Sequence, residues 1–219
     1  MIRADSIRLS FGQREIIRDA VLHLREGEIV GLLGRNGAGK SCLYRILLGE
    51  LKADYATIFV DGTYTKRPFA VPGLISYLPQ RSVHPRTMRV RTLLSLYGLS
   101  PAKLLEDLPE FAERLDSRFA NLSGGEARLL ELVLVLSLPS RFKLLDEPFT
   151  ELSPLGTARA SALIVQAGRT QGILISDHRY GDMLAITERN YLLHDLRLVP
   201  FARWEDLIAM DYLPPTAAG

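Results

Sequence analysis

Apolar and polar residues alternate over the first part of this chain, which predicts β-strands. The alternation covers residues 7–11 and 21–24 and is separated by a turn at Gly12-Gln13. Residues 28–33 are almost entirely apolar, which is typical of a strand buried on both faces. The chain therefore opens with a β-rich segment that leads into a core strand.

Later in the chain, short apolar runs alternate with segments of helical spacing. The apolar runs predict strands at residues 57–60, 74–78, 144–146, 173–176, 190–193 and 196–199. The helical spacing predicts helices at residues 41–48, 125–137, 155–168 and 204–210. Between about residues 87 and 119 only helical spacing occurs, punctuated by Pro101 and Pro109.

These elements predict an α/β fold in a single domain, residues 1–219. A core with an N-terminal antiparallel β-subdomain is expected from residues 1–80 and 122–213. Residues 81–121 are expected to form a small helical subdomain inserted into that core. Residues 214–219 resemble a frayed tail.

Composition limits the class of protein. The 219 residues include 27 basic and 25 acidic side chains, a net charge of +2, so a nucleic-acid partner is not implied. The single cysteine, Cys42, excludes an internal disulfide and suits a reducing compartment. Neither a secretory signal nor an apolar run of about 18 residues is visible. We therefore expect a cytoplasmic protein whose membrane role, if any, depends on a partner.

A phosphate-binding loop occupies the turn after the strand at residues 28–33. The sequence Gly34-Arg35-Asn36-Gly37-Ala38-Gly39-Lys40-Ser41 fits the pattern G-x-x-x-x-G-K-[ST], and a predicted helix follows it. Backbone N–H groups and the positive end of the helix dipole would face an anion there. Lys40 would bridge the β- and γ-phosphates, and the Ser41 hydroxyl would bind Mg²⁺. A glycine-rich turn that binds nothing is the alternative, but strand, loop and helix in this order disfavour it.

A second glycine-rich turn occurs downstream, at Leu122-Ser123-Gly124-Gly125-Glu126. This motif points to one particular family of nucleotide-binding proteins. With it the chain resembles the ATP-binding-cassette (ABC) ATPases over nearly its whole length. The order of motifs agrees as well: the phosphate-binding loop, Gln80 after a strand, this signature turn, Asp146-Glu147, and then His178. The resemblance implies a P-loop NTPase core with a mixed sheet, the cofactors ATP and Mg²⁺, and ATP hydrolysis.

The resemblance also implies roles for the polar residues that follow the strands. Asp146, at the end of an apolar strand, would hold Mg²⁺, and Glu147 would polarise the attacking water. Gln80 would contact Mg²⁺ and the same water. The alternatives are a solvated loop for the Asp-Glu pair and an ordinary surface position for the glutamine.

Two further assignments have strong structural alternatives. His178 would hydrogen-bond the γ-phosphate and align Glu147, but it could also start a helix capped by Ser176-Asp177. Phe11 stands where the family places an aromatic that stacks on adenine. Its alternative is a strand aromatic that faces the core.

In this family the signature turn acts on the ATP of a second subunit, so the resemblance implies a head-to-tail dimer, expected to be a homodimer. Ser123 and the N–H groups of Gly124 and Gly125 would form the second anion-binding site of each chain, at the start of the helix that follows the signature turn. Cys42 replaces the usual threonine after Ser41 and extends the nucleotide site. Glu151-Leu152-Ser153 replaces a loop that usually carries an aspartate, which puts the coupling of the two sites in question.

One charge stands inside an apolar strand. Lys143 interrupts the run before Asp146, where burial of an ammonium group is costly. We expect the side chain to extend to solvent, or the beginning of the strand to be less covered.

Residues 175–191 resemble the lipopolysaccharide-export ATPases and their branched-chain amino-acid importer relatives. Such ATPases work with integral membrane transporter subunits, so the resemblance implies a peripheral position on the inner face of the cell membrane. The insert would receive that partner on a basic edge and an apolar surface; the expected residues are Arg81, His84, Arg86, Arg89 and Arg91, with Leu93, Leu94, Leu96 and Tyr97. A solvated rim around a small helical core is the alternative. For the whole chain, a soluble ABC ATPase in a cytosolic assembly pathway and a non-hydrolysing regulatory subunit also stay open.

Overall fold

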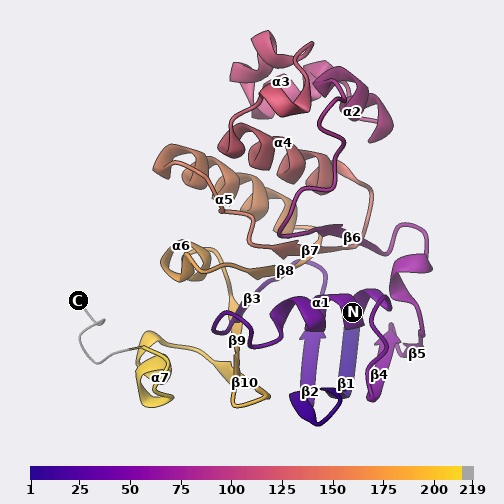
Figure 1. Ribbon diagram of the computed structural model, residues 1–219, viewed down its shortest axis with the longest axis vertical. Coiled ribbons are helices and arrows are strands. Elements are labelled where there is room, and N and C mark those ends of the chain that lie inside the picture. The colour runs from indigo at the N-terminus through magenta and orange to yellow at the C-terminus, as the bar shows by residue number, and fades with distance from the viewer. Residues whose placement is uncertain (214–219) are drawn as a thin grey trace.

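The computed structural model describes residues 1–213, so the predicted tail at 214–219 lies outside the described residues. Figure 1 shows two sheets with helices on both faces of the larger one. The smaller, antiparallel sheet has the strand order β2-β1-β4-β5 and confirms the predicted N-terminal β-subdomain. Its strands are β1 (Ile2–Phe11), β2 (Arg14–Leu24), β4 (Tyr55–Val60) and β5 (Thr63–Tyr64).

The larger sheet has the order β10-β9-β3-β8-β7-β6. Neighbouring strands are parallel except for the terminal pair β9–β10, which makes the sheet mixed, as expected. Its strands are β3 (Ile29–Leu33), β6 (Ile75–Leu78), β7 (Phe142–Asp146), β8 (Gly172–Ser176), β9 (Arg189–His194) and β10 (Arg197–Phe201). The loops after β3, β7 and β8 therefore meet at one edge of the sheet, where ligands bind in such folds.

The helices divide between the two faces of this sheet. Those of the described residues are α1 (Lys40–Leu48), α2 (Val90–Leu96), α3 (Pro101–Asp107), α4 (Gly124–Ser137), α5 (Pro154–Gly168), α6 (Tyr180–Leu184) and α7 (Trp204–Ala209), with 3₁₀ turns at Pro68–Ala70, Pro109–Arg114 and Phe119–Asn121. In Figure 1, α4 and α5 lie on one side of the large sheet, α1 lies on the side of the small sheet, and α2 and α3 lie beyond α4. None of the described helices is long and apolar enough to cross a membrane.

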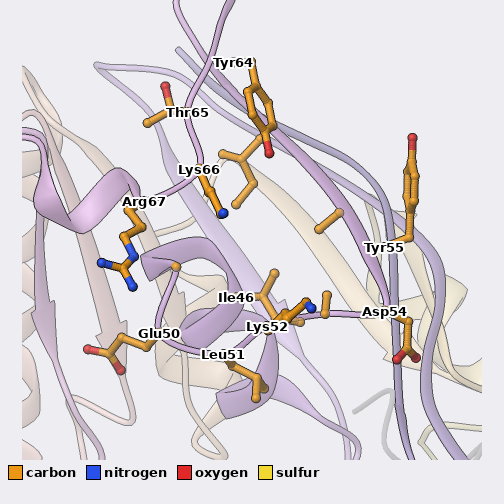
Figure 2. Close-up of a pocket in the computed structure, with 14 residues that line it drawn as sticks. Ile46, Glu50, Leu51, Lys52, Asp54, Tyr55, Tyr64, Thr65, Lys66 and Arg67 are labelled. Atoms are coloured by element: carbon orange, nitrogen blue, oxygen red, sulfur yellow. The ribbon is translucent and has the colours of Figure 1, made fainter.

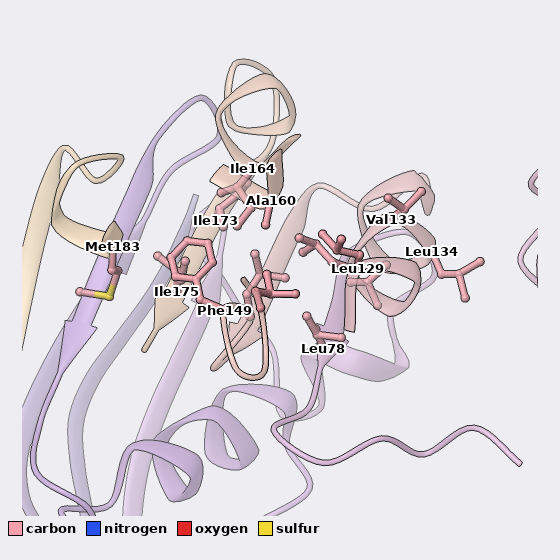
Figure 3. Packing of buried hydrophobic residues seen from close by; sticks show 14 of the residues in the cluster. Leu78, Leu129, Val133, Leu134, Phe149, Ala160, Ile164, Ile173, Ile175 and Met183 are labelled. Carbon is pink, nitrogen blue, oxygen red and sulfur yellow. The ribbon is translucent and has the colours of Figure 1, made fainter. Parts of the chain in front are cut away.

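Strand β3 shows why the central strands are apolar throughout. Ile29 and Leu33 pack into the core under α4 and α5, whereas Val30 and Leu32 pack into the core that includes α1 and the small sheet. Both faces are therefore buried, as in other parallel sheets covered by helices. Figure 3 shows the first of these cores, where Phe149 packs between Ile175 and the residues of α4.

The inserted helical subdomain is confirmed, but its apolar surface is not as predicted. Leu93 and Leu94 of α2 are buried in the same core as α4, so they offer no surface to a partner. Leu96 is 67% exposed and Tyr97 is half-buried. Helical spacing identified the apolar face of α2 but not that this face packs on the protein's own α4.

The expectation for Lys143 is wrong. The side chain is fully buried, and its ammonium group donates hydrogen bonds inward, to Val135 O at 3.0 Å, Leu138 O at 2.6 Å and Ser140 Oγ at 2.8 Å. These acceptors lie at the C-terminal end of α4, where carbonyl groups lack helical partners and the helix dipole is negative. The charge is thus matched by a helix end rather than by water.

Candidate functional site

The phosphate-binding loop connects β3 to α1 in the predicted way. Helix α1 begins at Lys40, one residue before the predicted start, and Gly39 precedes it with a φ of 110°. A Cβ atom on Gly39 would lie 2.9 Å from Ile16 Cγ2, so this position requires glycine for its backbone angle and for space. Lys40 Nζ donates to Gly34 O at 2.6 Å and folds back over the loop. Its ammonium group, with its pKa lowered by burial, therefore lies directly above the loop backbone.

Asp146 lies at the end of β7, between two hydroxyl groups. Its carboxylate accepts hydrogen bonds from Ser41 Oγ at 3.0 Å and from Ser176 Oγ at 2.8 Å. Burial raises the pKa of Asp146, while both hydroxyl bonds act against that rise. A serine hydroxyl beside a carboxylate offers the hard oxygen ligands that Mg²⁺ prefers. Ser41 and Asp146 thus fit the ion that the sequence implied.

Glu147 follows in a strained conformation. Its φ of 55° is in the left-handed region, and its N–H donates to Ser176 O at 2.7 Å. The carboxylate is 10% exposed and lies 3.5 Å from His178 Nδ1, measured from Oε2. The imidazole itself is 58% exposed. The structure therefore brings Glu147 and His178 together, with the histidine on the solvent side.

Asp177 is a buried carboxylate that the sequence indicated only as a possible helix cap. Its Oδ2 accepts from Phe149 N and its Oδ1 from Arg179 N, both at 2.8 Å. Helix α6 begins one residue after Arg179, so Asp177 forms a turn ahead of the helix rather than capping it. The bond from Phe149 joins the loop after β7 to the loop after β8, and the bond from Arg179 fixes the second loop itself, so Glu147 and His178 are held in their relative positions.

A cleft of about 420 Å³ is lined by nine of the nineteen predicted site residues. It is lined by Phe11, Arg14, Ile16, Asn36, Gly37, Gly39, Lys40, Ser41, Cys42, Gln80 and Glu147. Phe11 is 53% exposed, so the alternative of a core-facing aromatic is wrong. Arg14 and Ile16 were not predicted. The pairing of Phe11 with Arg14 across the first hairpin is the signal that would have placed Arg14 at the cleft.

A cavity larger than this cleft lies elsewhere among the described residues. It has a volume of about 550 Å³ and lies between the C-terminal end of α1 and strands β4 and β5. Figure 2 shows Glu50, Lys52, Lys66 and Arg67 around it, with Tyr55 and Tyr64 at its rim. No residue of the five motifs lines this cavity, so the size of a cavity does not identify the site.

The signature turn begins helix α4. Ser123 Oγ accepts from Glu126 N at 3.2 Å, and Ser123 N donates to Glu126 Oε2 at 2.7 Å, which is a reciprocal cap. Arg114 Nε also donates to Glu126, at 3.0 Å. None of the five signature residues lines the cleft that contains Lys40. Within one chain, the two glycine-rich turns therefore do not form one pocket.

A buried arginine on α4 connects the signature helix to the rest of the site. Arg128 is 5% exposed and donates to Pro79 O at 2.8 Å, to Asp146 O at 2.6 Å and to Glu147 O at 3.0 Å. Its Nη1 also lies 3.3 Å from Glu131 Oε2. The carbonyl of Pro79 immediately precedes Gln80. One side chain thus fixes the backbone of both the loop that carries Gln80 and the end of β7.

The same network corrects the prediction for His84. Its Nδ1 lies 2.9 Å from Glu131 Oε1 and its Nε2 lies 3.0 Å from Tyr97 Oη. The side chain is 9% exposed, so it does not belong to a basic edge. Arg81, Arg86, Arg89 and Arg91 are exposed, as predicted. The sequence signal for the network was the pair Arg128 and Glu131, two charges one turn apart in an otherwise apolar helix.

Ser153, which replaces the usual aspartate, caps helix α5. Its Oγ accepts a hydrogen bond from Gly156 N at 3.1 Å. Cys42 is half-buried and lines the cleft next to Ser41. Both departures from the family pattern thus leave the local helix geometry intact.

The comparisons with known proteins agree with this geometry. The model of the ABC transporter family matches residues 17–150. The lipopolysaccharide export system ATP-binding protein LptB of Acidithiobacillus ferridurans is 34% identical, over 95% of this chain and 92% of its own length. LptB of Escherichia coli K12 is 30% identical, over 90% of this chain and 88% of its own. A nucleotide-free ATP-binding cassette from an ABC transporter superposes with a TM-score of 0.81 at 21% identity, covering 98% of this chain and 96% of the other.

Proposed function

Because this chain belongs to the ABC transporter family, as an ATPase subunit that uses ATP and Mg²⁺, we propose which of its residues perform the hydrolysis and what it drives. Glu147 polarises the attacking water, His178 aligns it, and Gln80 contacts the same water. The observation that carries this assignment is the 3.5 Å approach of Glu147 Oε2 to His178 Nδ1 at a cleft lined by Lys40 and Ser41.

Different residues around the cleft bind the triphosphate, the base and Mg²⁺. Lys40 and the N–H groups at the start of α1 hold the triphosphate, and Phe11 stacks on the base. Ser41 and Asp146 hold Mg²⁺, which would supply the positive charge that offsets the phosphate oxygens. Lys40 turns from Gly34 O to the phosphates when ATP binds, since its present acceptor is a neutral carbonyl and a phosphate is a stronger one.

Glu147 and His178 act on the water from one side. With Nδ1 protonated, His178 donates toward Glu147 Oε2 and fixes the direction in which the carboxylate accepts a proton from water. The left-handed backbone of Glu147 and the bond to Ser176 O keep the carboxylate at the rim of the cleft instead of along the strand. Gln80 reaches the cleft from the loop that Arg128 holds through Pro79 O.

Two subunits are needed for a complete site. The signature turn of each chain lies outside its own cleft, and the N-terminus of α4 is a second end that attracts anions. We propose that two identical chains pack head to tail and enclose two ATP molecules between cleft and signature. ATP then stabilises the closed dimer because it binds both halves, and hydrolysis releases it.

The driven machinery is a membrane transporter. The similar proteins named above belong to a lipopolysaccharide export system. We propose that this chain lies on the inner face of the cell membrane and drives separate integral membrane subunits that move a lipid-like substrate outward. Its docking surface is the exposed part of the insert: Arg81, Arg86, Arg89 and Arg91, with Val83 and Leu96 as its exposed apolar residues.

The hydrolysis is tested with the variant Glu147→Gln. Steady-state phosphate release is expected to fall at least about a hundredfold, whereas ATP still binds and a dimer accumulates in its presence. Unchanged turnover would overturn the role of Glu147. A parent chain that binds ATP but never releases phosphate would instead indicate a regulatory subunit.

The partner is tested by copurification. The double variant Arg86→Glu and Arg89→Glu is expected to lose the integral membrane protein that copurifies with the parent, and to keep its affinity for ATP. The control is Glu188→Gln, because Glu188 lies at the opposite end of the large sheet from the phosphate-binding loop. Normal copurification of the double variant, or capture of a soluble scaffold by the parent, would refute the docking surface.

A further inference from the structure

Glu151 lies against the two glycines of the signature turn of the same chain. A Cβ atom built on Gly124 would lie 1.4 Å from Glu151 Oε2, and one built on Gly125 would lie 2.9 Å from Glu151 O. The carboxylate and the backbone of one residue thus occupy the space on the open side of both glycines. The negative charge of Glu151 therefore lies against the first turn of α4.

The position is held by the backbone rather than by partners of the side chain. Glu151 has a φ of 63°, in the left-handed region that glycine adopts more easily. The turn is closed by a hydrogen bond from Leu152 N to Phe149 O at 3.2 Å, and Phe149 N is anchored on Asp177. The residue is exposed, and among residues 1–213 its carboxylate has no hydrogen bond or ion pair.

The start of α4 favours such a negative charge. The N–H groups of the first turn have no acceptor within the helix, and the dipole adds a partial positive charge. Glu126 uses its carboxylate to cap Ser123 and lies beside Arg114, so it does not cover the glycines. Glu151 is therefore the acidic group that competes for this end of the helix.

We propose that Glu151 is an anionic gate on the signature turn: in a single subunit its carboxylate covers Gly124 while its backbone carbonyl lies against Gly125, and the carboxylate must move aside before the triphosphate held by a partner subunit can dock. This inference rests on the head-to-tail dimer proposed above. The loop after β7 then opposes dimer closure, because a carboxylate and a triphosphate repel each other at the same site.

The size of the effect follows from the charge alone. A carboxylate at an exposed helix N-terminus changes an equilibrium by roughly two- to fivefold. Because a closed dimer uses two signature turns, removing both carboxylates is expected to strengthen ATP-dependent dimerisation by about four- to twenty-five-fold. The gain is expected to shrink in concentrated salt, because exposed charges are screened.

The experiment uses the full chain with Glu147→Gln, so that ATP is bound but not hydrolysed. Dimerisation in saturating ATP and Mg²⁺ is measured by sedimentation velocity for this parent and for the additional variants Glu151→Gln, Glu151→Gly and Glu188→Gln. Glutamine keeps the shape and backbone of Glu151 and removes the charge. Glycine also relieves the backbone angle, and Glu188→Gln controls for the loss of one exposed acid far from the site.

Stronger dimerisation for both Glu151 variants at low salt, with Glu188→Gln unchanged, is the expected result. Equal or weaker dimerisation of Glu151→Gln overturns the gate; weaker dimerisation would mean that Glu151 contacts a cation of the partner. A gain that is the same at low and high salt overturns the electrostatic reasoning. If no variant, including the parent, forms an ATP-dependent dimer, the proposed function fails and the gate fails with it.

Discussion

Replacement of Lys143 by methionine is expected to change how the stability of the protein depends on pH. The ammonium group is fully buried, with Val135 O, Leu138 O and Ser140 Oγ as acceptors. Burial lowers its pKa from 10.5 to about 7. Methionine is unbranched like lysine, is one atom shorter because it lacks the terminal nitrogen, and has no proton to exchange, so the comparison isolates this group.

The sign follows from where the proton binds. Between pH 7 and 10.5 the unfolded chain keeps a proton on Lys143 and the folded chain has lost it. The unfolded state therefore binds more protons, and the free energy of unfolding rises with pH across this window. One pKa unit corresponds to about 1.4 kcal/mol, so the parent gains about 2 kcal/mol between pH 7 and 9. Below pH 7 both states are protonated, and the burial cost is present in full.

The assay is urea-induced unfolding of the parent and of Lys143→Met at pH 7, 8 and 9, without nucleotide. The difference in unfolding free energy should move by about 2 kcal/mol in favour of the parent as the pH rises. Lys52→Met is the control, because Lys52 is exposed and its replacement should leave the curve parallel to that of the parent. Parallel curves for Lys143→Met would refute the reasoning, since they would mean that the buried ammonium exchanges no proton in this range.

Two further predictions concern the nucleotide site. Arg128→Lys should lower kcat for ATP hydrolysis by about tenfold with little change in KM, because different nitrogens of the planar guanidinium reach the carbonyls of Pro79 and of Asp146 and Glu147, and a single ammonium nitrogen cannot take both positions; an unchanged kcat in phosphate-release assays would contradict this. Phe11→Ala should raise KM for ATP by about tenfold and leave kcat within about twofold, because stacking on the base contributes to binding alone; Phe11→Tyr should restore KM, and a loss confined to kcat would exclude stacking.

The residues that depend on local sequence were predicted from it. The phosphate-binding loop is a strand, a turn and a helix in succession, and Asp146-Glu147 follows an apolar strand directly. Each pattern fits within about ten residues, so its spacing contains the structural information. The strand order of the large sheet brings these segments to one edge, and the fold expected for the motif order was confirmed.

Residues whose partners belong to other elements of the fold were not predicted correctly. Lys143 was expected near solvent because the carbonyls that match its charge belong to the end of another element, α4. His84 looked like a surface cation because Glu131 and Tyr97, which bury it, belong to other segments. Leu93 and Leu94 show the same limit: spacing defines an apolar face but not what covers it.

Helix α4 is joined to strand β7 and the loop after it at three levels, and this explains why its charged residues are inside. Its first turn is the signature and contacts Glu151, its middle holds the carbonyls of Asp146 and Glu147 through Arg128, and its last turn accepts hydrogen bonds from Lys143. Buried charges with complete hydrogen bonding fix one relative position of two elements more strictly than apolar contacts, which tolerate sliding.

A shift of the signature turn on dimer closure would therefore displace the backbone that carries the carboxylates of Asp146 and Glu147. The hydrogen bonds made by Arg128 and those made by Lys143 differ in their dependence on pH. Arg128 keeps its charge at every pH at which the protein is folded. Lys143 loses its charge above about pH 7 and then donates two hydrogen bonds instead of three. Any coupling between closure and hydrolysis that depends on the far end of α4 must weaken in that range, whereas coupling through Arg128 must not. The pH dependence of kcat in Lys143→Met, compared with that of the parent, separates the two routes.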